Sequence, residues 1–145
     1  MNLRKIIAFV FLLIALVLGI IFYLQLQFPQ GLESYFDKEY YNQFGPLAIC
    51  VELLIAGYQL FFKHAKTNFT LALFAFTAIL DPVFNAVGLF VTNLPLYGTV
   101  LFIICAIIAL WIAFTNKFGL GRISFYWAFG GFVLGVIVEL FFNYW

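Results

Sequence analysis

The stretch Ile6–Leu24, IIAFVFLLIALVLGIIFYL, decides the class of this protein, because it carries no charge and no proline. A helix needs about 20 mainly apolar residues to cross a bilayer core of roughly 30 Å. The bulky end of the stretch, Ile20–Leu24, argues against a cleaved signal peptide, which has a shorter core and ends in small residues. The stretch therefore predicts a transmembrane helix close to the N-terminus.

The whole chain has the composition of a membrane protein. Of its 145 residues, 66% are hydrophobic, 22% are aromatic and only 9% are charged. A soluble domain could not cover so much apolar surface with so few charges. We expect an all-α integral membrane protein, a bundle of five transmembrane helices that forms one domain over residues 1–145. The predicted crossings are 6–24, 46–62, 69–91, 96–114 and 123–142, and residues 25–45 form an outer loop.

The lysines and arginines predict the orientation of this bundle. With five crossings, all but one of the seven cationic residues fall on one face of the membrane, and the exception is Lys38. Short loops rich in Lys and Arg remain in the cytoplasm. The N-terminus is therefore expected inside and the C-terminus outside, as is typical of a bacterial plasma membrane protein. The cations of the inner face are Arg4, Lys5, Lys63, Lys66, Lys117 and Arg122.

The outer loop has the pattern of a short amphipathic helix. Its apolar residues recur at helical spacing, opposite the charged ones, which suits a helix that lies on the outer leaflet. A lid or a docking surface for a partner is the alternative interpretation. The apolar face consists of Leu32, Tyr35, Phe36 and Tyr40, and the charged face of Glu33, Asp37 and Lys38.

Three carboxyl groups, those of Glu52, Asp81 and Glu139, lie inside the predicted crossings. A charged side chain at membrane depth is costly unless it is paired, hydrated or neutralised. Asp81 falls close to the midplane, and Pro82 follows it directly. Because proline removes a backbone hydrogen bond, we predict a helix break at Pro82. In one of two interpretations, Asp81 caps the outer half of the broken helix, and in the other it binds a ligand.

Polar and small residues form a stripe on three of the five predicted helices. Such stripes face protein or water rather than lipid, so we expect the second, third and fifth crossings to form the polar centre of the bundle. The first and fourth crossings lack a stripe and are expected to contact lipid or the helices of a partner. The stripes contain Glu52 and Gln59, then Thr77, Asp81, Asn85 and Gly88, and finally Gly131, Gly135 and Glu139.

Two interpretations of the stripes stay open. In the structural one, the carboxyl groups hold helices together, while Gly88, Gly131 and Gly135 let other backbones approach closely. In the functional one, a cation, a proton or a ligand with an amine or hydroxyl group binds between the helices, as at the interrupted helices of many transporters. The candidate binding residues are Glu52, Gln59, Thr77, Asp81, Asn85 and Glu139.

The chain lacks the motifs of the common enzyme classes. His64 is its only histidine, and Cys50 and Cys105 form no CxxC pair, so haem ligation, structural zinc and thiol-redox chemistry are not expected. It has no nucleotide-binding loop and no nucleophile elbow. Its cations are too dispersed for nucleic-acid binding. We expect no catalytic activity, no metal and no cofactor.

These observations favour a non-catalytic polytopic protein, a small accessory or structural subunit within a membrane complex or a homo-oligomer. Its expected partners are the lipid bilayer and other transmembrane helices, since the chain has almost no mass outside the membrane and carries the contact motif Gly131-xxx-Gly135. The alternative is a small ion- or proton-coupled transporter, or a binder of a lipid-like or cationic ligand, that uses the intramembrane carboxyl groups.

Overall fold

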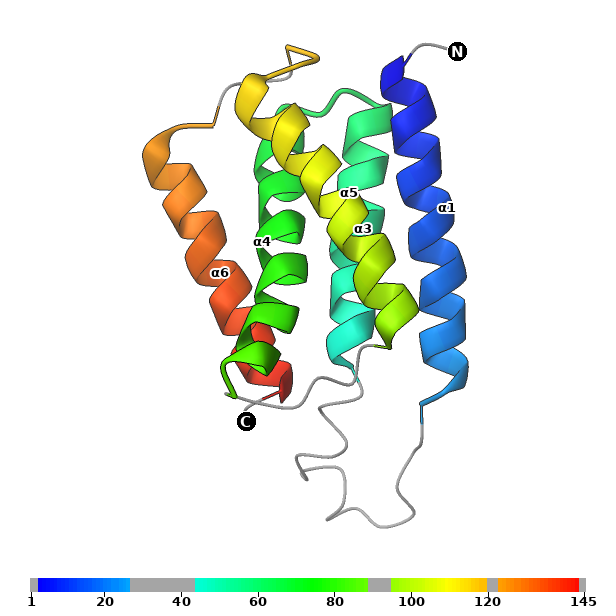
Figure 1. The fold of residues 1–145 in the computed structure, drawn as a ribbon. Helices are drawn as coiled ribbons and strands as arrows, with labels where there is room; N and C mark the ends of the chain where they lie inside the picture. The colour runs from blue at the N-terminus through cyan, green and yellow to red at the C-terminus, as the bar shows by residue number, and fades with distance from the viewer. Residues whose placement is uncertain (1–2, 27–43, 89–94, 120–122, 144–145) are drawn as a thin grey trace, which may run out of the picture.

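The part of the chain that the structure describes consists of α-helices and short turns. The computed structural model describes residues 3–26, 44–88, 95–119 and 123–143. Within these ranges the chain forms five α-helices and no strand (Figure 1). The all-α class is therefore confirmed, whereas the predicted amphipathic helix of the outer loop lies outside the described residues. The helices are α1 (Leu3–Leu24), α3 (Gly45–Phe61), α4 (Thr67–Ala86), α5 (Leu96–Thr115) and α6 (Phe125–Asn143).

Three of these helices, α1, α4 and α5, are long and apolar enough to cross a membrane. The other two, α3 and α6, are apolar but shorter. Because helices of this length and composition require a lipid environment, the chain belongs to the membrane proteins. The number of crossings and the orientation stay predictions.

α1 and α3 form an antiparallel pair on one side of the bundle (Figure 1). The buried residues of α1 are spaced alternately four and three apart, as in a left-handed coiled coil. Gly57 allows close contact, since a β-carbon there would lie 3.1 Å from Cγ of Leu12 and 3.3 Å from the carbonyl oxygen of Ala8. The buried residues of α1 are Arg4, Ala8, Phe11, Ala15, Leu18 and Phe22.

α4 lies at the centre of the bundle, where it contacts α3, α5 and α6 (Figure 1). Its buried surface accordingly extends around most of the helix, unlike the single buried face of α1. α3 and α6 also touch each other, beside α4. The three helices predicted to carry polar stripes therefore do meet.

α5 packs along α4 on one face, while large apolar side chains on its other faces are exposed, so contact of this crossing with lipid or a partner stays a prediction. Its buried positions are mostly small, and small residues let transmembrane helices approach closely without polar side chains. The rings of Phe74 on α4 and Phe102 on α5 meet edge to face, with 6.1 Å between their centroids. The buried residues of α5 are Gly98, Phe102, Cys105, Ala106, Ala109, Ile112 and Ala113.

α4 continues through Pro82 and ends at Ala86, so the predicted helix break is wrong. A proline removes only its own N–H, here the donor to the carbonyl group of Ala78, and its ring disturbs only the preceding turn. Because α4 ends about one turn after Pro82, few further hydrogen bonds depend on this position. Asp81 consequently lies inside the helix and does not cap it.

Gly88 ends α4 rather than packing against another helix, which corrects its predicted role. It follows the C-cap residue Val87, is exposed, and has a φ of +85°. Among the residues that the structure describes, no atom lies within 4 Å of the position that a β-carbon at Gly88 would occupy. Glycine adopts this left-handed conformation without the steric cost of a side chain. The helix predicted over 69–91 thus ends at Ala86, and residues 89–91 lie outside the described ranges.

Candidate functional site

A contact between a hydroxyl and a carboxyl group joins the middle of α3 to the middle of α4. Oγ1 of Thr77 lies 3.3 Å from Oε1 of Glu52. Thr77 is fully buried, and Glu52 is partly buried. Both residues belong to the polar stripes predicted for their helices, and the structure brings these two stripes face to face.

The hydroxyl group of Thr77 has one proton for two acceptors. It lies 2.9 Å from the carbonyl oxygen of Leu73 and 3.3 Å from Oε1 of Glu52. A hydroxyl group donates one hydrogen bond at a time and can also accept one. A proton on Glu52 would therefore complete the network, with Glu52 donating to Thr77 and Thr77 donating to Leu73.

The other carboxyl oxygen of Glu52, Oε2, is buried and has no hydrogen-bond partner among the residues that the structure describes. An unpaired buried polar atom costs about 1–3 kcal/mol. Gln59, two turns further along the same face of α3, likewise has a buried Oε1 without a partner in the described ranges. This face of α3 therefore offers acceptor oxygens to a proton or a cation.

α6 closes a third side of the contact. A β-carbon at Gly135 would lie 3.2 Å from Oγ1 and 3.3 Å from the backbone nitrogen of Thr77. One at Gly131 would lie 3.5 Å from the ring of Phe69. Both glycines are buried. The glycine face of α6 thus contacts α4 of the same chain and is not available to the helix of a partner.

The remaining candidate residues are placed differently from one another. Asp81 is 1% exposed and lies one turn after Thr77 on the same face of α4. Asn85, a further turn along, is exposed. The backbone of Glu139 is part of α6, and its side chain lies outside what the structure describes. The structure therefore brings together Glu52 and Thr77, with Asp81 nearby, and leaves Asn85 at the surface.

Within the described ranges, the contact offers few ligands for a metal ion. Among the described residues, no group of three or more His, Cys, Asp or Glu side chains could hold a metal ion. Divalent cations such as Ca²⁺ prefer six or more oxygen ligands. A carboxyl group with one hydroxyl neighbour matches the needs of a proton, or of a small monovalent cation that keeps other ligands.

Arg4 has a role that its place in the sequence does not reveal. Its side chain is 6% exposed, and Nη1 donates to the carbonyl oxygens of Leu60, at 2.7 Å, and of Phe61. These carbonyl groups belong to the last turn of α3, where acceptors lack partners in the helix and the helix dipole is negative. Arg4 thereby fixes the start of α1 to the end of α3.

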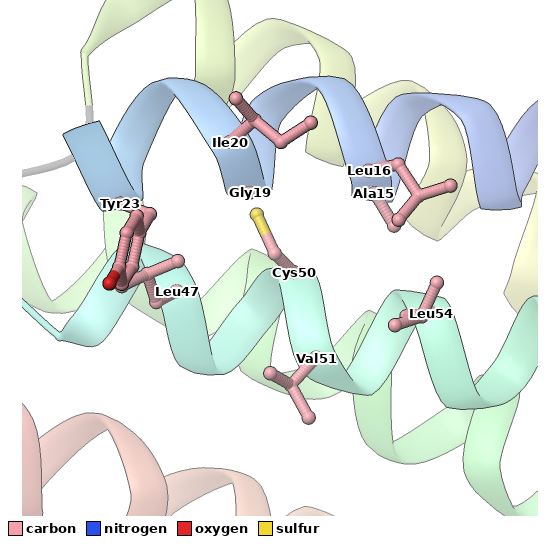
Figure 2. A pocket seen from close by; sticks show the side chains of 9 residues that line it. All are labelled: Ala15, Leu16, Gly19, Ile20, Tyr23, Leu47, Cys50, Val51 and Leu54. Atoms are coloured by element: carbon pink, nitrogen blue, oxygen red, sulfur yellow. The ribbon is translucent and has the colours of Figure 1, made fainter.

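A hollow of about 280 Å³ lies between α1 and α3, in the half of the pair away from Arg4 (Figure 2). Cys50 points across it from α3 toward Gly19 of α1 (Figure 2), whose lack of a side chain leaves space. The ring of Tyr23 lies at one end. The walls are otherwise apolar. They consist of Ala15, Leu16, Ile20, Leu47, Val51 and Leu54.

Comparisons with models of known protein families, with curated proteins and with solved structures find no match to this chain. The fold and the site define a class: an all-helical membrane protein with a buried carboxyl–hydroxyl contact between two helices. The residues that define the site are Glu52 and Thr77.

Proposed function

We propose that this protein crosses the plasma membrane five times, with its N-terminal end inside the cell. The short helices α3 and α6 pack lengthwise against α1 and α4 (Figure 1), which supports a common depth in the bilayer. α1 begins and α6 ends at opposite ends of the bundle (Figure 1), as an odd number of crossings requires. Arg4, Lys63 and Lys117 gather where α1 begins, and the positive-inside rule places that end in the cytoplasm.

α3 is the critical helix for this topology. Its 17 residues have a length of about 25 Å, at the lower limit for a transmembrane helix. Local thinning of the bilayer accommodates a short helix at a modest cost. The lengthwise contact with α1, with Gly57 against Ala8 and Leu12, supports an upright position for α3.

The proposed function of the bundle is to bind a proton or a small monovalent cation at the carboxyl group of Glu52. The observation that carries this proposal is the buried Oε2 without a described partner, beside a Thr77 hydroxyl group that has one proton for two acceptors. Either a proton on the carboxyl group or a cation at Oε2 would reduce the number of acceptor oxygens that lack a partner among the described residues. The protein is then a non-catalytic binder or an ion-coupled carrier and needs no cofactor.

A proton titration of the purified protein in dodecyl maltoside tests this function. Wild type is compared with Glu52→Gln and with Asp81→Asn, which removes another buried carboxyl group of the bundle. We expect Glu52→Gln to remove a titrating proton that Asp81→Asn retains. Sodium or potassium chloride, compared with choline chloride at equal ionic strength, releases this proton if a cation takes its place. Identical curves for wild type and Glu52→Gln in all three salts would show the proposal to be wrong.

A second candidate, an accessory subunit of a larger membrane complex, is favoured by the surface of α6. Contact with α4 covers the glycine face of α6, and large apolar side chains cover much of the remainder. Such side chains can face lipid or the helices of a partner. The exposed ones are Phe125, Tyr126, Trp127, Phe129, Phe132, Val133, Leu134, Ile137 and Phe141.

Native mass spectrometry separates the second candidate from the first. The protein is extracted gently from its own membrane at its native expression level. A second protein in a fixed ratio would support the subunit function, and the identity of that protein would define it. A lone monomer would contradict the subunit function and leave the Glu52 site as the basis of activity.

A further inference from the structure

A strongly positive pocket lies at the end of the bundle where α1 begins. Arg4, Lys63 and Lys117 line it together with Leu3 and Phe118, around a volume of about 410 Å³. No carboxylate belongs to the described lining, so no negative side chain there offsets the three positive charges. Because α1 and α5 are long enough to cross a membrane, this end of the bundle lies at a membrane surface.

Lys63 occupies a position at which glycine is the common residue. α3 ends in a turn in which the N–H of His64 donates to the carbonyl oxygen of Gln59 at 2.9 Å. Lys63, inside this turn, has a φ of +56°, in the left-handed region. A side chain is unfavourable in this conformation, whereas glycine adopts it freely. Since the backbone would be more stable with glycine, the charge of Lys63 points to a function.

Lys117 reaches the same pocket from the end of α5. Its N–H donates to the carbonyl oxygen of Ile112 at 3.2 Å. Asn116, which precedes Lys117, has a φ of +51°, in the left-handed region. Nδ2 of Asn68 donates to Oδ1 of Asn116 at 3.0 Å, which ties this turn to α4. Nζ of Lys117 lies 5.6 Å from the centre of the Trp111 ring, a cation–π contact. The backbone that carries Lys117 is therefore held in place.

Arg4 adds hydrogen-bond donors that the fold does not use. A guanidinium group carries five N–H donors, and both hydrogen bonds of Arg4, to Leu60 and Phe61, come from Nη1. Nε and Nη2 make no hydrogen bond to the residues that the structure describes. The planar guanidinium fork matches the geometry of phosphate oxygens.

We propose that this pocket binds a phosphate group that carries net negative charge, in the headgroup of an anionic phospholipid or as free phosphate. The two lysines supply charge and Arg4 supplies directed donors, the combination found in basic pockets that hold anionic headgroups. The lipid is the favoured source, because Leu3 and Phe118 add apolar walls and the side chain of the neighbouring Trp111 is exposed. This site is separate from Glu52 and does not depend on proton or cation binding there.

Trp111 reports on the pocket because its ring lies against Lys117. The substitutions Trp127→Phe and Trp145→Phe leave Trp111 as the only tryptophan. This protein is reconstituted in dioleoyl-phosphatidylcholine vesicles that contain either brominated phosphatidylglycerol or brominated phosphatidylcholine. Quenching of Trp111 measures the relative binding of the two lipids, and we expect stronger quenching by brominated phosphatidylglycerol.

Matched variants show which residues cause the preference for phosphatidylglycerol over phosphatidylcholine. Lys63→Gln and Lys117→Gln are each expected to weaken it about fivefold, the factor that corresponds to one cation near an anionic surface. Lys66→Gln is the control, because Lys66 is an exposed lysine at the same end of the bundle and does not line the pocket. Lys63→Gly is expected to unfold at a higher SDS concentration than wild type and yet to weaken the preference as much as Lys63→Gln does, so the weakening would not reflect misfolding.

Inorganic phosphate separates the two sources of the ligand. Added in exchange for chloride at constant ionic strength, it abolishes the preference if the pocket accepts free phosphate and leaves it unchanged if the pocket requires the lipid. Equal quenching by both lipids in the wild-type pocket would overturn the proposal. Equal loss of preference in Lys66→Gln and Lys63→Gln would also overturn it, because a diffuse positive surface would then suffice.

Discussion

The hydroxyl group of Thr77 lies 3.3 Å from the carboxyl group of Glu52, and this contact is a polar link between α3 and α4. The same hydroxyl oxygen lies 3.2 Å from the position that a β-carbon at Gly135 of α6 would occupy. One threonine therefore stands where three helices meet. Changes in its hydrogen bonding and changes in the packing of α6 are expected to affect each other.

Removal of the Thr77 hydroxyl group should weaken the bundle. Thr77→Val keeps the volume of the side chain and deletes the hydrogen bond to Glu52, so we expect a loss of about 1 kcal/mol in the free energy of unfolding. Thr77→Ser keeps the hydroxyl group and should recover the titration of Glu52. SDS titration of the purified protein measures the stability. A Thr77→Val protein with unchanged stability and an unchanged Glu52 titration would mean that the hydroxyl group is not linked to the carboxyl group.

The two glycines at positions 135 and 130 should respond in opposite ways to alanine. Gly135→Ala places a β-carbon 3.2 Å from Oγ1 and 3.3 Å from the backbone nitrogen of Thr77, so α6 must shift, at a cost of about 1–3 kcal/mol. Gly130→Ala meets no atom of the described residues within 4 Å and should be neutral, or stabilising by up to about 1 kcal/mol, since alanine favours the helix. Unfolding in SDS compares them, and equal effects would contradict the close contact between α6 and α4.

Arg4 should contribute stability through the end of α3. Arg4→Gln removes the charged donor to the carbonyl oxygens of Leu60 and Phe61, and we expect a loss of roughly 1.5–3 kcal/mol in the free energy of unfolding. Arg4→Lys keeps the charge and should lose less. Lys66→Gln removes an exposed cation from the same end of the bundle and serves as the control. A loss in Lys66→Gln as large as that in Arg4→Gln would indicate a general effect of net charge instead.

Helix positions could be predicted from the sequence far better than helix neighbours. The segment predicted over 96–114 is the helix Leu96–Thr115, because an unbroken apolar run bounded by Pro95 leaves little choice. The partner of that helix could not be predicted, since α5 is apolar on every side and its polarity does not mark a buried face. Only the spacing of Ala106, Ala109 and Ala113 carried a signal for the contact with α4.

The candidate site was partly visible in the sequence. The stripes placed Glu52 and Thr77 on inward faces, but the pairing of two particular residues depends on the relative height of two helices. Helix periodicity contains no information on that height. The role of Arg4 was invisible for a different reason, because a cation at the start of a transmembrane helix is already explained by topology. Its partners lie more than fifty residues away in the chain.

The proposed crossing of the membrane by α3 would place the Glu52 contact at membrane depth and the basic pocket at the inner surface. Lys66 is exposed in the turn between α3 and α4, so its side of the membrane decides this point. The measurement is labelling of Lys66→Cys by a membrane-impermeant maleimide in intact cells, with Cys50 and Cys105 replaced by alanine and with Leu26→Cys as the reference for the outer face. With α3 across the membrane, Lys66→Cys is expected to react only after the membrane is permeabilised, whereas Leu26→Cys reacts in intact cells. Labelling of Lys66→Cys from outside would contradict this topology, because α3 would then lie on the outer surface.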